Sequence, residues 1–256
     1  MMEGKKMNRI QKLFERTQAE GRAAYVAYLT MGAPTVEASF AAAEKVLAEG
    51  ADILELGVPF SDPAADGPTI RRAAEIALKN GATLEGILEG VPALRAAHPE
   101  TPLVLFTYYN VAYRRGLERF AEEAARAGVD AALLVDVPLE ERAEPLAALR
   151  RHGLTLVPLV APTTPGGRVE AIAEGLDDSF LYAISVKGVT GARASLPPGV
   201  AERLADLKRR VKMPVVVGFG IRTPEEGAAL ANSGGCDGFV IGSALVKRLQ
   251  LDGAGA

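Results

Sequence analysis

The chain has 256 residues, of which 48% are hydrophobic, and its formal net charge at pH 7 is −3. This mildly acidic balance gives no support to a nucleic-acid or anionic-membrane surface, and the single cysteine, Cys236, excludes an intrachain disulfide. No apolar run reaches membrane-spanning length, and the N-terminal segment lacks the apolar core of a signal peptide, so we expect a cytoplasmic protein.

Short apolar runs alternate along the chain with segments rich in Ala, Leu, Glu and Arg. An amphipathic N-terminal segment predicts a first helix. The strand candidates that follow are eight in number: 23–29, 52–57, 102–108, 131–136, 154–160, 180–185, 214–220 and 238–243. Their nearly continuous apolar character is typical of parallel strands buried on both faces. Helical patterns between them include residues 36–50, 117–129 and 223–234.

Eight β–α units without a linker predict one (β/α)8 TIM-barrel domain over residues 1–256, with an extra N-terminal helix. A doubly wound open sheet is the alternative. Such a sheet usually has fewer strands and a glycine-rich first turn, whereas the first turn here reads LTMGAPT. The glycine-rich nucleotide-binding motifs of that class are absent from the sequence.

The stretch LELGVPFSDPAADGP, residues 54–68, contains two candidate catalytic carboxylates, Glu55 and Asp66. Glu55 interrupts an apolar strand, and strand alternation places it on the face opposite Leu54 and Leu56. If that face lines the barrel mouth, desolvation raises the pKa of Glu55 and suits it to acid–base chemistry. Asp66 follows on a proline-rich loop within reach of the same cavity. The alternatives are an ion pair inside the barrel for Glu55 and a turn or cap role for Asp66.

Glycines lie at or just after the ends of three late strand candidates, where barrel enzymes bind phosphate. They are Gly188 and Gly191, then Gly218 and Gly220, then Gly242 with Ser243. Glycine allows close backbone approach, and N–H groups at a helix start donate to phosphate. We therefore predict a phosphate site here, with turns and close packing as the alternative.

Lys187 follows the sixth strand candidate and raises the possibility of a Schiff-base nucleophile. Its Gly, Ser and Thr neighbours favour a solvated position on a loop that closes over substrate. With only His98 and His152 in the chain, neither a metal site nor a cysteine–histidine pair has support.

The motif LELGVPFSDPAADGPTI resembles the signature of the tryptophan synthase alpha subunit family. YLTMGAP, TYYN, LLVDVP, KGVTGA, VGFGI and IGSA follow that family's order over essentially the whole chain. The resemblance implies a (β/α)8 barrel that cleaves indole-3-glycerol phosphate to indole and glyceraldehyde 3-phosphate by a retro-aldol reaction in tryptophan biosynthesis. It implies no metal and no organic cofactor in this chain.

The resemblance also assigns roles to individual residues. Glu55 becomes the main acid–base residue, and Asp66 accepts a hydrogen bond or proton from the indole N–H. The residues implied in substrate binding are Tyr108, Tyr182, Thr190 and Phe219, and those implied in phosphate binding are Gly191, Gly220, Gly242 and Ser243.

Members of the family work with a beta subunit, which carries pyridoxal phosphate (PLP) and condenses the indole with serine. The resemblance therefore implies an αββα heterotetramer in which indole passes between the two sites. Pro59, Asp62 and Asn110 lie where the family's partner-contacting segments fall.

Two rival functions remain open at this point. The first is another phosphate-binding barrel enzyme, such as a sugar-phosphate isomerase or a Schiff-base aldolase using Lys187. The second is a non-catalytic subunit that only activates a partner enzyme. The carboxylate pair and the glycines at the strand ends favour catalysis over this second function.

Overall fold

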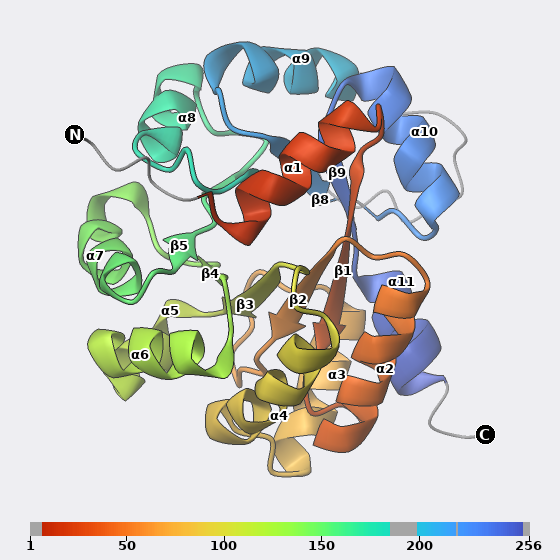
Figure 1. Ribbon diagram of the computed structural model, residues 1–256, viewed down its shortest axis with the longest axis vertical. Coiled ribbons are helices and arrows are strands. Elements are labelled where there is room, and N and C mark those ends of the chain that lie inside the picture. Colours follow the sequence, from red (N-terminus) through yellow and green to blue (C-terminus); the bar gives the residue numbers. More distant parts are fainter. Residues whose placement is uncertain (1–6, 185–198, 219, 253–256) are drawn as a thin grey trace.

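The computed structural model describes residues 7–184, 199–218 and 220–252. Within these residues one parallel sheet has the order β5-β4-β3-β2-β1-β9-β8-β7-β6 (Figure 1). Its strands are β1 (Ala24–Thr30), β2 (Ile53–Gly57), β3 (Leu103–Thr107), β4 (Ala131–Leu134), β5 (Thr155–Leu156), β6 (Leu159–Val160), β7 (Leu181–Ile184), β8 (Val215–Gly218) and β9 (Gly238–Ile241).

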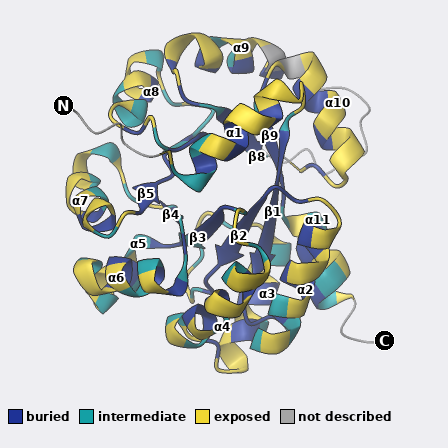
Figure 2. Ribbon diagram, in the orientation of Figure 1, coloured by how far each residue is buried: buried dark blue, intermediate teal, exposed yellow. Residues whose placement is uncertain are grey.

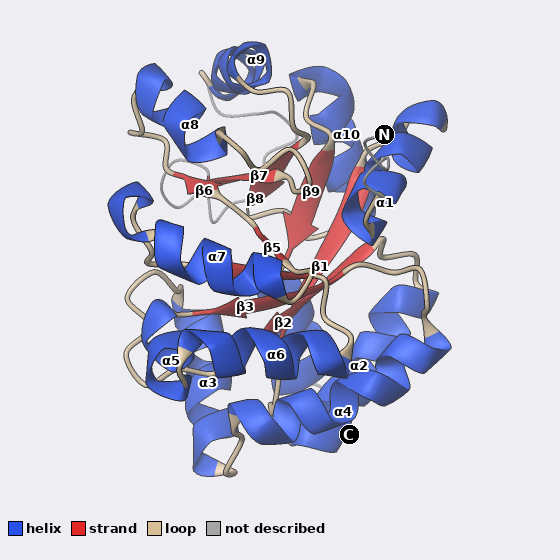
Figure 3. Cartoon of the chain, turned by 60° about the vertical axis from the view of Figure 1, so that its left-hand side comes forward, coloured by secondary structure: helices blue, strands red, loops and turns tan. Residues whose placement is uncertain are grey.

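Helices lie between the strands and surround the sheet (Figure 3). They are α1 (Arg9–Ala19), α2 (Val36–Ala48), α3 (Pro68–Lys79), α4 (Leu84–Ala97), α5 (Tyr109–Arg115), α6 (Leu117–Ala127), α7 (Ala143–Arg151), α8 (Gly166–Ala173), α9 (Val200–Arg210), α10 (Pro224–Gly234) and α11 (Ser243–Leu245), with a 3-10 turn η1 (Leu139–Glu141) and a π-helical segment η2 (Val246–Leu251). The three helices expected from the sequence are confirmed as α2, α6 and α10.

The fifth strand candidate, 154–160, differs from the prediction because it forms two short strands. β5 pairs with β4, and β6 pairs with β7. Pro158 lies between them and has no N–H to donate to a ladder. The segment still joins both ends of the sheet, since Val157 N–H donates to Ala132 O (2.9 Å) and Tyr182 N–H donates to Pro158 O (2.8 Å). The sheet therefore closes into a barrel through one interrupted strand.

Strand alternation separates two hydrophobic clusters. The outward residues, such as Leu54 and Leu56, pack with the surrounding helices, whereas Val26, Val104 and Val240 belong to the cluster inside the barrel. Figure 2 shows the strands as the buried centre and the helices with their exposed sides outward. The continuous apolar runs of the sequence follow from this arrangement, because β1 and β2 are buried along their whole length.

Helix α1 is the extra N-terminal helix that the sequence predicted, and the structure places it across the N-terminal end of the barrel. Ile10, Leu13 and Phe14 join the inner cluster, and the ring of Phe14 lies 5.8 Å from that of Phe180. Figure 1 shows α1 crossing in front of the strands. With this end covered, the opposite end of the barrel is the open one.

Candidate active site

Glu55 lies in the middle of β2 and points into the barrel. Its register partner on β1 is Tyr28 and its partner on β3 is Val104, both members of the inner cluster. The Glu55 side chain is 0% exposed, and neither carboxyl oxygen has a hydrogen-bond partner among the described residues. Burial raises the pKa of Glu55 to about 8. At neutral pH the resting carboxyl group therefore carries a proton that it can donate.

Asp66 lies on the loop between β2 and α3. Its N–H donates to Pro63 O (3.1 Å), and the hydroxyl of Tyr108 donates to its Oδ2 (3.0 Å). Burial raises the pKa of Asp66, while the hydrogen bond from Tyr108 and the charge of Arg71 act in the opposite direction. Asp66 is therefore a hydrogen-bonded, half-buried carboxyl, unlike the unpartnered and fully buried Glu55. Two carboxyl groups in unlike environments can take different roles in proton transfer.

Tyr28 is a candidate site residue that the sequence did not single out. Its ring lies 5.0 Å from that of Phe106, and a Cβ added to Gly57 would lie 2.3 Å from its hydroxyl oxygen. Burial raises the pKa of Tyr28, and the charges of Asp66 and Glu55 contribute. The phenol thus occupies the space above Glu55 that a side chain at position 57 would fill. Only the pairing of β1 with β2 reveals this, because the two residues lie far apart in the sequence.

Tyr182 stands on the opposite side of the barrel, on β7. It belongs with the inner cluster, and a Cβ at Gly218 would lie 2.5 Å from its hydroxyl oxygen. Burial raises the pKa of Tyr182, and the charge of Glu55 raises it further. The predicted pocket residue Tyr182 therefore does share the barrel interior with Glu55, and Gly218 leaves the room that its ring needs.

The predicted phosphate and loop residues are only partly described. Gly242 follows β9 and precedes Ser243, the first residue of α11, and a Cβ at Gly242 would lie 3.5 Å from Tyr28 Cβ. Gly220 and Ser243 are exposed. Thr190, Gly191 and Phe219 lie outside the described residues, as do Lys187 and Gly188. Gly242 and Ser243 thus stand at the same end of the barrel as the carboxyl groups.

Two of the residues predicted to contact a partner, Pro59 and Asp62, belong to the loop that carries Asp66, and the third, Asn110, lies at the start of α5. Asp62 and Asn110 are exposed, whereas Pro59 is buried. A hollow of about 340 Å³ opens on the outer side of this loop, lined by Phe60, Ser61, Asp62, Pro63, Ala64, Arg71, Glu75 and Leu78. The surface predicted for a partner is therefore continuous with the loop that carries Asp66.

Other possible chemistries find little support in the part of the chain that the structure describes. No group of three or more His, Cys, Asp or Glu side chains is arranged to hold a metal ion there. Cys236 is buried, and burial raises the pKa of its thiol to about 11, which disfavours the reactive thiolate. Across those same residues, every helix is too short or too polar to span a membrane.

Fold and site together place the chain in the class of (β/α)8 barrels with titratable side chains gathered at the C-terminal ends of the strands, where barrel enzymes carry out their chemistry. A family model described as "Tryptophan synthase alpha chain" matches residues 14–255. The chain belongs to the tryptophan synthase alpha chain family, which confirms the resemblance seen in its motifs.

Individual relatives agree with this family. The tryptophan synthase alpha chain of Geobacter sulfurreducens is 46% identical over 95% of this chain and 91% of its own length. Among solved structures, the alpha subunit from Legionella pneumophila is 36% identical with a TM-score of 0.86, over 94% of this chain and 88% of that one. A chain of Mycobacterium tuberculosis tryptophan synthase is 38% identical with a TM-score of 0.87, over 95% of this chain and 92% of that one.

The established function follows from this membership. The chain is an indole-3-glycerol-phosphate lyase of tryptophan biosynthesis, which releases indole and glyceraldehyde 3-phosphate. The alpha chain carries no cofactor, and PLP belongs to the beta chain.

Proposed function

We propose that Glu55 is the acid and base of the cleavage. In its protonated form Glu55 donates to C3 of the indole ring, so that the C–C bond breaks without leaving a carbanion. The resulting carboxylate accepts the hydroxyl proton of the adjacent glycerol carbon, which becomes the aldehyde. Glu55 thus ends the cycle protonated, as it began, and no net proton is consumed. The observation that supports this role is a fully buried carboxyl with no hydrogen-bond partner among the described residues.

Asp66 takes the complementary role at the other end of the indole ring. Protonation of C3 places positive charge on the ring nitrogen, and a carboxylate that accepts a hydrogen bond from the N–H stabilises this charge. The hydrogen bond from Tyr108 supports such a role, because it favours the ionised form of Asp66.

The remaining predicted residues hold the substrate. Tyr108, Tyr182, Thr190 and Phe219 surround the indole and glycerol groups, and the phosphate is bound by Gly191, Gly220, Gly242 and Ser243. The position of Gly242 beside Tyr28, at the end of the barrel that carries Asp66, supports this arrangement. The rival with a Schiff base on Lys187 has no comparable support, because the chain belongs to the tryptophan synthase alpha chain family.

The decisive measurement is indole release from indole-3-glycerol phosphate by wild type, Glu55→Gln and Asp66→Asn. We expect both variants to lose about 100-fold or more in kcat, which is typical of removing an acid–base group. Glu122→Gln is the matched control, since Glu122 is exposed on α6. Wild-type turnover by Glu55→Gln would contradict the role of Glu55, and wild-type turnover by Asp66→Asn would contradict that of Asp66. Borohydride trapping on Lys187 would instead favour the aldolase.

We also propose that the chain acts in the cytoplasm, as a single domain spanning residues 1–256, within an αββα heterotetramer with the beta subunit. The solved structure of Mycobacterium tuberculosis tryptophan synthase supports association with that subunit. Asp62, on the Asp66 loop, and Asn110, on α5, are exposed and contact the partner, while the buried Pro59 shapes the start of that loop. Sedimentation of the mixed subunits tests the assembly, and two separate peaks at micromolar concentration would contradict it.

A further inference from the structure

The hydroxyl group of Tyr108 joins two neighbouring points of the Asp66 loop. It donates to Asp66 Oδ2 (3.0 Å) and accepts from Ala65 N–H (3.0 Å). The Tyr108 ring also stacks on Phe60, with the ring centroids 4.9 Å apart and an interplanar angle of 23°. A side chain at the end of β3 therefore holds the loop after β2 at three residues.

These contacts use the only proton that the phenol can donate. Tyr108 is 4% exposed, and its hydroxyl proton goes to Asp66. The hydroxyl is therefore not free to donate to a substrate while this bond is in place. The other carboxyl oxygen, Asp66 Oδ1, makes no hydrogen bond to any described residue. Among the described residues, one oxygen of Asp66 is thus bonded to the protein and the other has no partner.

We propose that Tyr108 is a positioning residue, whose hydroxyl fixes the Asp66 carboxylate and leaves Oδ1 to accept the substrate N–H. This inference rests on the role proposed above for Asp66. The family resemblance implied that Tyr108 binds substrate directly. The inference instead assigns its hydroxyl group to positioning Asp66. The ring and the hydroxyl then act separately, the ring by packing on Phe60 and the hydroxyl through Asp66.

A structural role for the loop alone would need only the stacked ring. The hydrogen bond adds an electrostatic effect, since donation to a carboxylate favours its ionised form. Loss of the hydroxyl therefore raises the pKa of Asp66, and the acid limb of the pH profile shifts toward higher pH. The position of that limb is a readout that loop packing by the ring does not move.

Tyr108→Phe tests the proposal because it removes the hydroxyl and retains the ring that stacks on Phe60. Tyr25→Phe is the matched control, since Tyr25 is also buried and stacks on Phe239 (5.6 Å), but on the outer face of β1. We would measure kcat and KM for indole-3-glycerol phosphate cleavage between pH 5 and pH 9, with saturating beta subunit. We expect kcat to fall about tenfold in Tyr108→Phe, as for one lost hydrogen bond to a charged group. In Tyr108→Phe, KM stays near the wild-type value and the acid limb of the pH profile moves to higher pH. In Tyr25→Phe, we expect both kcat and the position of the acid limb to stay as in wild type.

The double variant Tyr108→Phe/Asp66→Asn decides whether the hydroxyl acts through Asp66. If it does, the double variant is no slower than Asp66→Asn alone. Additive losses with an unshifted acid limb would overturn the positioning role and leave the role of Asp66 intact. Wild-type activity in Asp66→Asn would instead overturn the proposed role of Asp66 and this inference together, so the two failures are distinguishable.

Discussion

A single buried carboxyl group makes the stability of this protein depend on pH in an unusual direction. The pKa of Glu55 is about 8 in the folded chain, against 4.5 for the unperturbed group. Between these values the folded state binds more protons than the unfolded state, so this residue lowers the free energy of unfolding as pH rises. Most carboxylates in ion pairs have the opposite effect. The loss of unfolding free energy that comes from ionising Glu55 reaches its full size only above pH 8.

We therefore expect Glu55→Gln to gain stability over wild type as pH rises. The amide does not ionise, so the difference in unfolding free energy increases from pH 4.5 and reaches about 3 kcal/mol at pH 7. Urea unfolding at pH 4.5, 6 and 7.5 measures it, with Glu122→Gln, at an exposed position, as the control. A pH-independent difference for Glu55→Gln would show that the carboxyl group is solvated in the folded protein.

Individual site residues were predictable from the sequence only where a local pattern was broken. Glu55 stands out because it is charged within an apolar strand, and its position inside the barrel is confirmed. The bond between Tyr108 and Asp66 joins residues 42 apart, and the contact of Tyr28 with Gly57 depends on the register of two strands. Neither contact has a local signal, because each arises only once the barrel brings its strands together.

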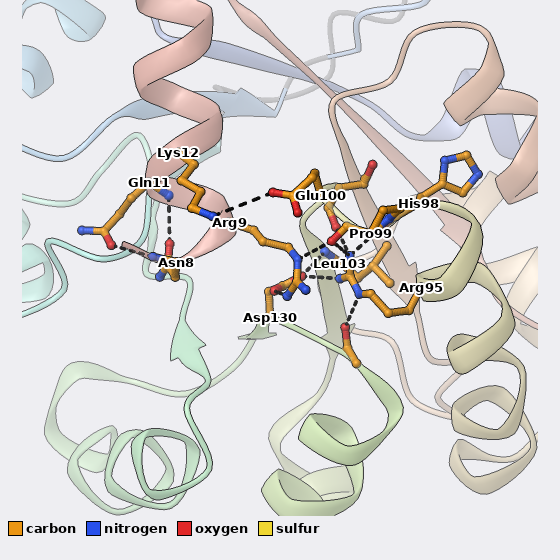
Figure 4. Close-up of polar contacts among 12 residues, drawn as sticks. Asn8, Arg9, Gln11, Lys12, Arg95, His98, Pro99, Glu100, Leu103 and Asp130 are labelled. Carbon is orange, nitrogen blue, oxygen red and sulfur yellow. Dashed lines mark hydrogen bonds and ion pairs between the residues drawn. The ribbon is translucent and has the colours of Figure 1, made fainter. Parts of the chain in front are cut away.

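At the scale of elements, a partly buried ion-pair network at Asp130 holds helices against the end of the barrel that α1 covers (Figure 4). Asp130 accepts from Arg9 through Oδ1 (2.8 Å), and from Arg95 (2.5 Å) and Leu103 N–H (2.8 Å) through Oδ2. Arg95 also donates to the carbonyl groups of residues 128, 98 and 101. This network joins α1, the end of α4, the start of β3 and the turn before β4.

The two arginines of this network should contribute very unequally. The side chain of Arg95 is 14% exposed and that of Arg9 is 37% exposed. Arg95→Met removes one of the two cations that pair with the partly buried Asp130 carboxylate, and a charged donor from the carbonyl groups of residues 128, 98, 99 and 101, so we expect a loss of about 3 kcal/mol in unfolding free energy. Arg9→Met breaks a half-exposed pair, and we expect about 1 kcal/mol or less. Urea denaturation of both variants checks the order, and equal losses would contradict it.

At the scale of the whole molecule, the barrel was predictable because every β–α unit repeats the same pattern and parallel strands must be covered on both faces. Closure of the barrel was predicted too, but the interruption of the strand that closes it was not. The sequence suggested a continuous strand over 154–160, whereas only two residues pair with β4 and two with β7. Pro158 is visible in the sequence. Whether it interrupts the strand depends on whether a neighbouring strand needs an N–H donor at that position, which the sequence does not show.

The interrupted strand, residues 155–160, is called the seam here because it joins the two ends of the sheet. It should be the least stable part of the barrel sheet. β1 and β2 pair over five residues, from Val26 with Ile53 to Thr30 with Gly57, while each half of the seam pairs over two. Local opening is favoured where few backbone hydrogen bonds must break, so the seam opens before the rest of the sheet. We expect amide hydrogens in 155–160 to exchange about tenfold or more faster than those in 26–30, in native-state exchange near pH 7. The segment 103–107, which pairs on both sides with whole strands, is the internal control. Equal protection of seam and control would show that packing, and not the number of ladder bonds, sets the order in which this barrel opens.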